Sequence, residues 1–144
     1  MITEDYVSFE IAKLLKTKGF DEKCQKVYIH NGQLLWAQIF MEGESFVDNK
    51  CIEEVANYDN WITYTQGEYA YLCPTLQMAM KWLREEKGVA IIPILSSVLD
   101  NEKFLWDIKI IVAKTYDTYS QGWVYEKQES ACDVAIKYCL ENLI

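Results

Sequence analysis

The sequence predicts an α+β fold in which three main helices pack with an antiparallel sheet of about four strands. Two observations predict it. Helical periodicity occurs at the start, middle and end of the 144 residues, and runs that read as pairs of strands lie between those helices. The order is helix, two strands, helix, two strands, helix, which favours antiparallel pairing. Because no linker divides the chain, we expect residues 1–144 to form a single domain.

The first predicted helix covers about residues 6–18. Its aliphatic residues recur on one face, as expected for a helix that packs on a core. Thr3 or Asp5 is the expected N-cap. Gly19 is the expected end, because glycine readily adopts the left-handed conformation that closes many helices.

A β-hairpin is predicted next, with strands near 24–30 and 33–40. Asn31–Gly32 lies between two apolar runs, and both residues tolerate the positive φ that two-residue hairpin turns require. The following stretch, 41–61, has no convincing period, although we consider a short helix over "NKCIEEVANY" within it. The run "WITYTQGEYAYL" then reads as β-structure.

The central helix, residues 76–87, has the clearest helical pattern in the chain. Pro74 is expected in its first turn and Gly88 at its end. Its apolar residues form a main stripe and a separate flank that holds Met78 and Trp82. A core position for this flank and a soft groove for a partner are both open readings, of which we favour the core.

The last predicted helix, about residues 129–143, repeats this layout. Cys132 and Cys139 lie on its main aliphatic face, and Val134 and Tyr138 form a second flank. We expect both helices to lay their aliphatic faces on the sheet and to turn their aromatic flanks toward one another. Convergent packing explains the similarity of the two helices more simply than duplication does.

A second strand pair is predicted between these helices, over 89–95 and 104–113. Pro93 lacks a backbone donor, so the first strand should lie at a sheet edge or carry a bulge. In the second strand every other residue is apolar, which indicates one buried face. We expect this face to lie against the helices; it comprises Phe104, Trp106, Ile108 and Ile110. Residues 115–125 read as a polar, aromatic connection.

The charge distribution narrows the class of partner. The net charge is −8, and residues 42–68 contribute seven acids and one lysine, a net −6. Direct nucleic-acid binding is not expected, because phosphate contacts require clustered lysine and arginine. The acidic segment reads either as a solvated connection, which is the commoner case, or as a surface for a basic partner.

Cysteine usage and hydropathy indicate a cytoplasmic protein. Five cysteines, an odd number in a chain of this length, fit reduced thiols better than a disulfide framework. The start "MITEDYVSFE" lacks the basic region of a signal peptide. No apolar run approaches the roughly 20 residues that a membrane span requires.

Catalytic and cofactor motifs are not evident. His30 is the only histidine, and no cysteine lies in a context typical of a nucleophile. The cysteine spacings do not match a zinc site, and no glycine-rich phosphate loop occurs. We therefore expect no metal and no cofactor, and we rank an enzyme below a binding protein.

Aromatic side chains crowd two predicted connections and form the candidate partner-binding residues. Tyrosine and tryptophan are favoured at protein interfaces because they bury a large area with few torsions. The alternative is that they pack locally beneath long loops. The candidates are Trp61, Tyr64, Tyr69, Tyr71, Tyr116, Tyr119 and Trp123.

Three stretches, "YVSFEIAKLLKTKGFDE", "CPTLQMAMKWLREEKG" and "ACDVAIKYCLENLI", together resemble a group of short proteins of gut Bacteroidales. The resemblance covers about a third of the chain, and the C-terminal stretch is the most specific. It implies a prophage or mobile-element context and supplies no assigned activity or catalytic residues.

The leading functional hypothesis is therefore a small accessory protein of a mobile element that acts by binding another protein. The main alternative is an acidic mimic of nucleic acid that occupies a nucleic-acid-binding enzyme. A small-molecule enzyme ranks third. The sequence does not indicate an oligomeric state.

Overall fold

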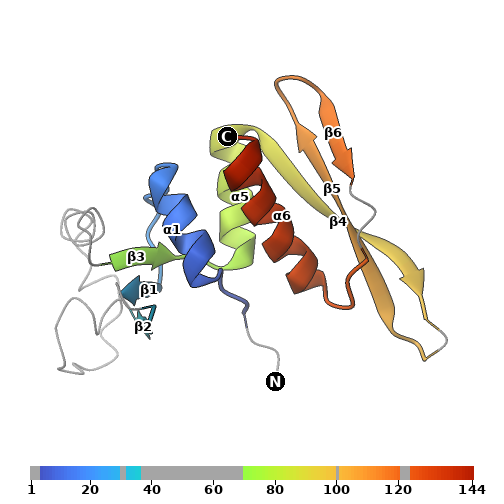
Figure 1. The fold of residues 1–144 in the computed structure, drawn as a ribbon, viewed down its shortest axis with the longest axis horizontal. Coiled ribbons are helices and arrows are strands. Elements are labelled where there is room, and N and C mark those ends of the chain that lie inside the picture. The colour runs from blue at the N-terminus through green and yellow to red at the C-terminus, as the bar shows by residue number, and fades with distance from the viewer. Residues whose placement is uncertain (1–3, 30–31, 37–69, 100, 121–123) are drawn as a thin grey trace. The chain divides into compact units, whose positions relative to one another are not determined.

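The computed structural model of the protein describes residues 4–29, 32–36, 70–99, 101–120 and 124–144 (Figure 1). It confirms the α+β class and the antiparallel pairing. The described residues contain three helices and six strands, which form two three-stranded antiparallel sheets where a single sheet of about four strands was predicted. The chain divides into two compact units, residues 7–74 and residues 1–6 with 75–144.

The unit of residues 7–74 combines helix α1 (Phe9–Thr17) with a sheet in the order β2–β1–β3. Strand β1 (Lys26–Ile29) pairs on one side with β2 (Leu34–Trp36) and on the other with β3 (Ala70–Cys73). This confirms the predicted hairpin. Helix α1 packs on β3, and the core residues include Val7, Ile11, Leu15, Val27 and Leu72.

Helix α1 begins later than predicted. Its N-cap is Ser8, whose Oγ accepts a hydrogen bond from the Ile11 N–H at 3.3 Å, so the expectation of Thr3 or Asp5 was wrong. The reason lies in the preceding backbone: the Val7 N–H donates to the carbonyl of Pro74 at 3.1 Å. That bond holds the chain extended up to Ser8, where the helix can start.

The second unit contains α5 (Leu76–Lys87), three strands and α6 (Gln128–Asn142). Strands β4 (Val89–Val98), β5 (Phe104–Val112) and β6 (Asp117–Ser120) form a meander in the order β4–β5–β6. Helix α6 packs on β4, β5 and α5 (Figure 1). The fully buried side chains of this core include Leu83, Val89, Ile136, Cys139 and Leu140.

Strand β4 confirms both alternatives predicted for Pro93. It is an edge strand of its sheet, and its register with β5 shifts between Leu95 and Ser97, as at a β-bulge. The Ala113 N–H donates a hydrogen bond to the Gly88 carbonyl at 2.9 Å, and this bond shows which residues of β4 point their N–H groups toward β5. Pro93 then falls where an N–H would point out of the sheet, so its missing donor costs no ladder bond.

The segment predicted as a polar connection contains strand β6, which the sequence analysis missed. Its residues pair with β5 from Asp117↔Val112 to Ser120↔Lys109, and three of its four side chains are exposed. An exposed edge strand buries no apolar face, so it carries no alternating apolar pattern. Tyr116, at φ 57°, forms the preceding turn.

Helix α5 matches its predicted bounds, and its packing supports a core position for the flank. Trp82 is buried and Met78 is half-buried. Gly88 closes the helix at φ 66°, as predicted, whereas Pro74 precedes the N-cap Thr75 and so lies before the first turn. On α6, the ring of Tyr138 lies 6.2 Å from that of Tyr119 in β6.

Candidate functional site

The exposed apolar side chains of the described residues concentrate on one part of the molecule, the distal end of the β4–β5 hairpin. Eight large apolar residues are exposed, and six of them belong to this hairpin. They are Ile92, Ile94, Leu95, Val98, Leu99 and Phe104. Strand β4 also carries no charged residue over its ten positions. Single exposed apolar residues mean little, whereas such a concentration marks a candidate binding surface.

The face turned toward α6 carries the most coherent part of this surface. Register places Leu95 opposite Trp106 and Val98 opposite Phe104, so these four side chains lie on one face. The rings of Phe104 and Trp106 are 6.3 Å apart. We call Leu95, Val98, Phe104 and Trp106 the hairpin strip. Ile92 and Ile94 lie on the opposite face of the strand.

Trp106 and Phe104 were predicted to be core residues, and for this end of the strand the prediction was wrong. Ile108 and Ile110, on the same face, are buried as predicted, but Phe104 is 51% exposed and Trp106 is only half-buried. Alternation correctly placed all four on one face. It did not show how far along the strand the helical cover extends.

The lengths of the elements explain this difference. The ten residues of β4 extend about 33 Å at the usual rise of a strand. The 15 residues of α6 extend only about 22 Å. The helix therefore covers only part of the hairpin, and the turn at residues 99–103 lies beyond it (Figure 1). In the sequence, the predicted second strand, residues 104–113, is already longer than the predicted last helix, residues 129–143, at these rises, and that comparison was the signal that could have found the exposed end.

A small pocket continues the same face toward the helix. Its walls come from Ile108 and Ile110 of β5, from Tyr119 of β6, and from Ala131, Val134, Ala135 and Tyr138 of α6, completed by Asp107 and Tyr125. Its empty volume, including the part open to solvent, is about 290 Å³. We call this the tyrosine pocket, after Tyr119, Tyr125 and Tyr138.

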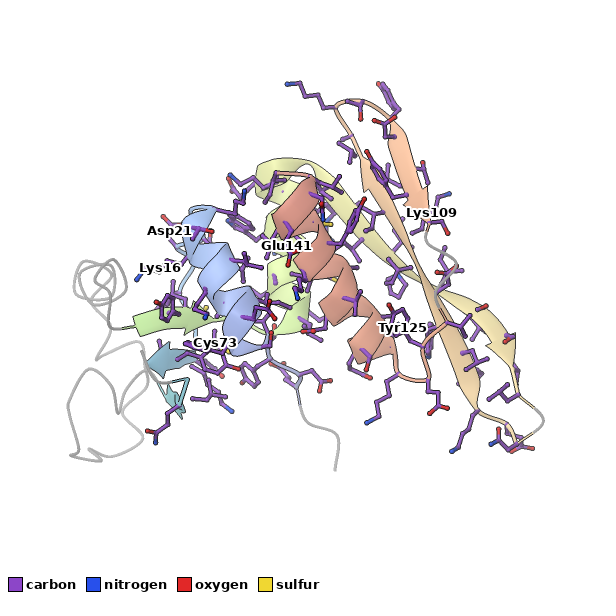
Figure 2. All side chains as sticks on the ribbon, viewed as in Figure 1. Lys16, Asp21, Cys73, Lys109, Tyr125 and Glu141 are labelled. Carbon is purple, nitrogen blue, oxygen red and sulfur yellow. The ribbon has the colours of Figure 1, made fainter. Side chains whose placement is uncertain are left out.

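Tyr125 connects the pocket to the hairpin strip. Its backbone exchanges two hydrogen bonds with Trp106, at 2.7 and 2.8 Å, in an isolated antiparallel bridge. It lies in the connection between β6 and α6 (Figure 2). Burial raises the pKa of the Tyr125 hydroxyl, and the nearby carboxylate of Asp107 raises it further. The pKa shift therefore indicates that this carboxylate and this phenol lie close together.

Asp107 also lines the pocket, from the same strand as Ile108 and Ile110. Because Trp106 bonds to Tyr125, the N–H of Ile108 also points away from β4. The Asp107 Oδ1 accepts this N–H at 2.6 Å. The carboxylate is thereby held beside the backbone of β5, between Trp106, which pairs with Tyr125, and Lys109, which pairs with Ser120. Lys109, the basic residue of β5, does not line the pocket; its side chain is labelled in Figure 2.

The predicted partner-binding residues have different surroundings. Tyr116 is 88% exposed in the β5–β6 turn, and Tyr119 is half-buried in the tyrosine pocket. Tyr71 is in the other unit, where its ring lies edge-on to Phe9, with 5.6 Å between the centroids. Trp61, Tyr64, Tyr69 and Trp123 lie outside the described residues, as do His30 and the acidic residues 42–68.

Tyr71 belongs to an aromatic cluster with Phe9 and Tyr28. The Phe9 and Tyr28 rings are 5.3 Å apart, and the Tyr28 hydroxyl donates to the Val7 carbonyl at 2.8 Å. The ammonium group of Lys16 lies 4.8 Å from the centroid of the Tyr71 ring, and Lys13 similarly covers Phe9. These rings are already in contact with cations, so the cluster reads as packing of α1 on the sheet.

The four thiols in the described part of the chain are buried and unsuited to catalysis. Cys132 and Cys139 are buried, as predicted, as are Cys24 and Cys73, and all four are free. Burial raises the pKa of Cys132 to about 11 and the pKa values of Cys73 and Cys139 to about 12. A nucleophilic cysteine needs a lowered pKa, so none of these four has the required environment.

The described residues contain neither a metal-binding group nor a membrane-spanning helix. Within the described residues, no group of three or more histidine, cysteine, aspartate or glutamate side chains is placed to hold a metal ion. None of the described helices has the length and apolar character needed to cross a bilayer.

In comparisons with known proteins, no family model, curated protein or solved structure matches the chain.

Proposed function

We propose that this protein acts by binding another protein, and that the hairpin strip is the central contact surface. The observation that carries this proposal is the exposure of Leu95, Val98 and Phe104 together on one face, with Trp106 beside them. Aromatic and aliphatic side chains of this kind form the centres of protein interfaces, where they exclude water and supply most of the binding energy.

The surrounding architecture supports a contact surface over an enzyme. The pocket beside the strip is small and mainly apolar, whereas ligand sites usually combine an apolar lining with several convergent polar groups. The four described thiols have raised pKa values or are deeply buried, which opposes nucleophilic chemistry. Four free, buried cysteines also favour a reducing compartment such as the cytoplasm.

The biological setting that we propose is that of a phage or mobile-element accessory protein, on the resemblance of the two ends and the central helix to proteins of gut Bacteroidales. Acidic mimicry of nucleic acid stays a prediction, because the acids on which it depends lie within residues 42–68, outside the described residues.

Site-specific photo-cross-linking in the organism that carries the protein tests the proposal. A benzophenone amino acid at position 98 should cross-link one partner, because Val98, at 58%, is the most exposed member of the strip. The same amino acid at position 116 serves as the comparison, since Tyr116 is 88% exposed at the opposite end of β5.

A matched pair of variants completes the test. Replacing both Val98 and Phe104 by serine should lower partner affinity at least about tenfold, because two exposed interface anchors are lost. Tyr116→Ser should leave partner affinity unchanged. Cross-linking from position 116 but not from position 98 would contradict the proposal, as would equal affinity in the double variant with its fold intact.

A further inference from the structure

We propose that the protein forms a weak symmetric dimer in which the edge strand β4 pairs with β4 of a second copy, over residues 94–99. The contact lies along the open edge of the sheet, in the plane of the strands, and does not depend on the protein partner proposed for the hairpin strip. Three features of this segment support the dimer: its outward backbone groups, its symmetric sequence and its lack of charge.

The outer edge of β4 offers backbone donors and acceptors to another strand. Trp106 directs its backbone groups to Tyr125, so Leu95, which lies opposite it in the ladder, directs its own N–H and C=O away from β5. The Leu99 N–H donates across the hairpin at 2.7 Å, so the preceding residue, Val98, also points outward. Strand β4 is at the edge of its sheet, and within the described part of the chain no hydrogen bond is found for these outward groups.

The sequence of this edge is symmetric. Residues 94–99 read "ILSSVL", with two aliphatic residues on each side of two serines. When two such segments pair antiparallel about an axis between the serines, Leu95 lies opposite Val98 of the second copy, and Ile94 lies opposite Leu99 of the second copy. Every aliphatic side chain of the segment thereby gains an aliphatic neighbour, which is the self-complementarity that a two-fold interface requires.

Both faces of the segment have apolar surface to bury. Leu95 and Val98 are 47% and 58% exposed on the side of the hairpin strip. Ile94 and Leu99 are 40% and 37% exposed, and alternation places them on the opposite side. A partner packed on the strip alone would leave this second pair in water, whereas an added strand brings neighbours to both faces. The occupant of the edge is therefore a strand.

The bulge and Pro93 fix the register of this strand pair. The register of β4 with β5 shifts between Leu95 and Ser97, so Ser96 is the extra residue of the bulge. In the symmetric pair the two bulges lie opposite each other, so both strands contain the same number of residues between their outward positions. Pro93 is the next outward position toward the start of β4 and has no N–H, so the new ladder ends there.

The charge distribution favours a closed dimer of this chain. Each copy has a net charge of −8, yet none of the ten residues of β4 is charged, so pairing places no acid of one β4 beside an acid of the other. The other edge strand, β6, has only four residues and includes Asp117, and short, charged edges oppose pairing. Association therefore stops at two copies, because the two-fold pair uses both β4 edges.

Sedimentation velocity of the purified full-length protein, over about 5–500 µM, tests the dimer. A contact of six residues per copy is far smaller than the roughly 20–30 residues a side of a standard interface, so the dissociation constant should be on the order of 100 µM. Ser97→Lys should raise it at least about tenfold, because it places two ammonium groups near the two-fold axis. Thr118→Lys is the matched control: Thr118 is exposed on β6, on the same face of the sheet as Ser97, and this variant should dimerise normally.

Amide hydrogen exchange measured by NMR locates the contact on the edge. At ten times the dissociation constant about one fifth of the chains are monomers, so the outward N–H groups of Leu95 and Val98 should exchange about fivefold more slowly than in dilute protein. The N–H groups of Ile94 and Ser97 point toward β5 and serve as internal references, because their protection should not depend on protein concentration.

Three results would overturn the dimer. A monomer at 500 µM, with unchanged exchange at Leu95 and Val98, would leave this edge to a strand of another protein. Normal dimerisation of a folded Ser97→Lys protein would place the contact elsewhere, and growth beyond two copies would contradict the closed pair. These measurements use the protein alone, so they are independent of the cross-linking test, in which a product between two copies is recognised by its peptides.

Discussion

Replacing Ile110 and Phe104 by alanine, one at a time, separates the covered part of β5 from its exposed end. The two residues lie on the same face of the same strand, and alternation alone would give them similar roles. In the structure Ile110 is 3% exposed, whereas Phe104 is 51% exposed. The change in unfolding free energy should follow this difference in burial.

The expected magnitudes come from transfer and cavity costs. Ile110→Ala removes three carbons from a covered site and leaves a cavity, so it should cost about 3 kcal/mol. Full burial of phenylalanine is worth about 1.5–3 kcal/mol, and about half of the Phe104 ring remains in water. Phe104→Ala also leaves no enclosed cavity, because solvent fills the space. Its cost should therefore be near 1 kcal/mol.

Urea unfolding followed by circular dichroism and by tryptophan fluorescence measures both values. Coincidence of the two signals tests whether the unfolding is two-state, and an unchanged denaturant slope shows that the unfolded state is comparable. A loss of 3 kcal/mol or more for Phe104→Ala would refute the exposed strip, and it would return Phe104 to the core. A loss below 1 kcal/mol for Ile110→Ala would contradict the placement of α6 on this strand.

Four further predictions concern the thiols and the ends of α5. Cys132 and Cys139 should resist alkylation in the folded protein, as read by mass spectrometry of the labelled peptides, and rapid labelling of both would contradict their burial. Burial raises the pKa of Cys139 from 9.0 to about 12, so between these values the unfolded thiol loses its proton while the folded thiol keeps it. The free energy of unfolding should therefore fall as pH rises from about 9 toward about 12, and a rise over this range would be contrary evidence. Gly88→Ala should destabilise by about 1–2 kcal/mol in thermal or urea unfolding, because the residue has φ 66° while an added Cβ would meet only ordinary contact at 3.8 Å, and Gly88→Asn should cost less. Thr75→Ala should cost about 1 kcal/mol through loss of the cap bond to the Met78 N–H, whereas Thr75→Ser should keep most of it; equal losses for both would argue against the cap.

Local chemistry allowed the sequence to predict much of the element list. Gly88 and the apolar stripe of α5 fixed its bounds, because a left-handed glycine and a helical period are properties of nearby residues. Pro93 likewise indicated an edge strand with a bulge, since a missing donor is a local fact. The burial of Cys132 and Cys139 followed from the aliphatic face that they share on α6.

Strand β6 and the tyrosine pocket depend on tertiary contacts, so the pattern of nearby residues in the sequence could not predict them. Strand β6 is an exposed edge whose pairing with β5 depends on a partner strand rather than on its own periodicity. The pocket beside it required residues from β5, β6 and α6 to converge.

In the hairpin strip, the sequence determined which side chains share a face, and the tertiary structure determined which of them are buried. Alternation in the sequence determined that Phe104, Trp106, Ile108 and Ile110 share one face, because successive side chains of a strand point to opposite sides. Which part of that face is buried depends on the helix that lies over it. Helix α6 rises about 1.5 Å per residue, and the strand rises about 3.3 Å. The helix therefore ends before the strand does, so Ile108 and Ile110 became core and Phe104 became surface.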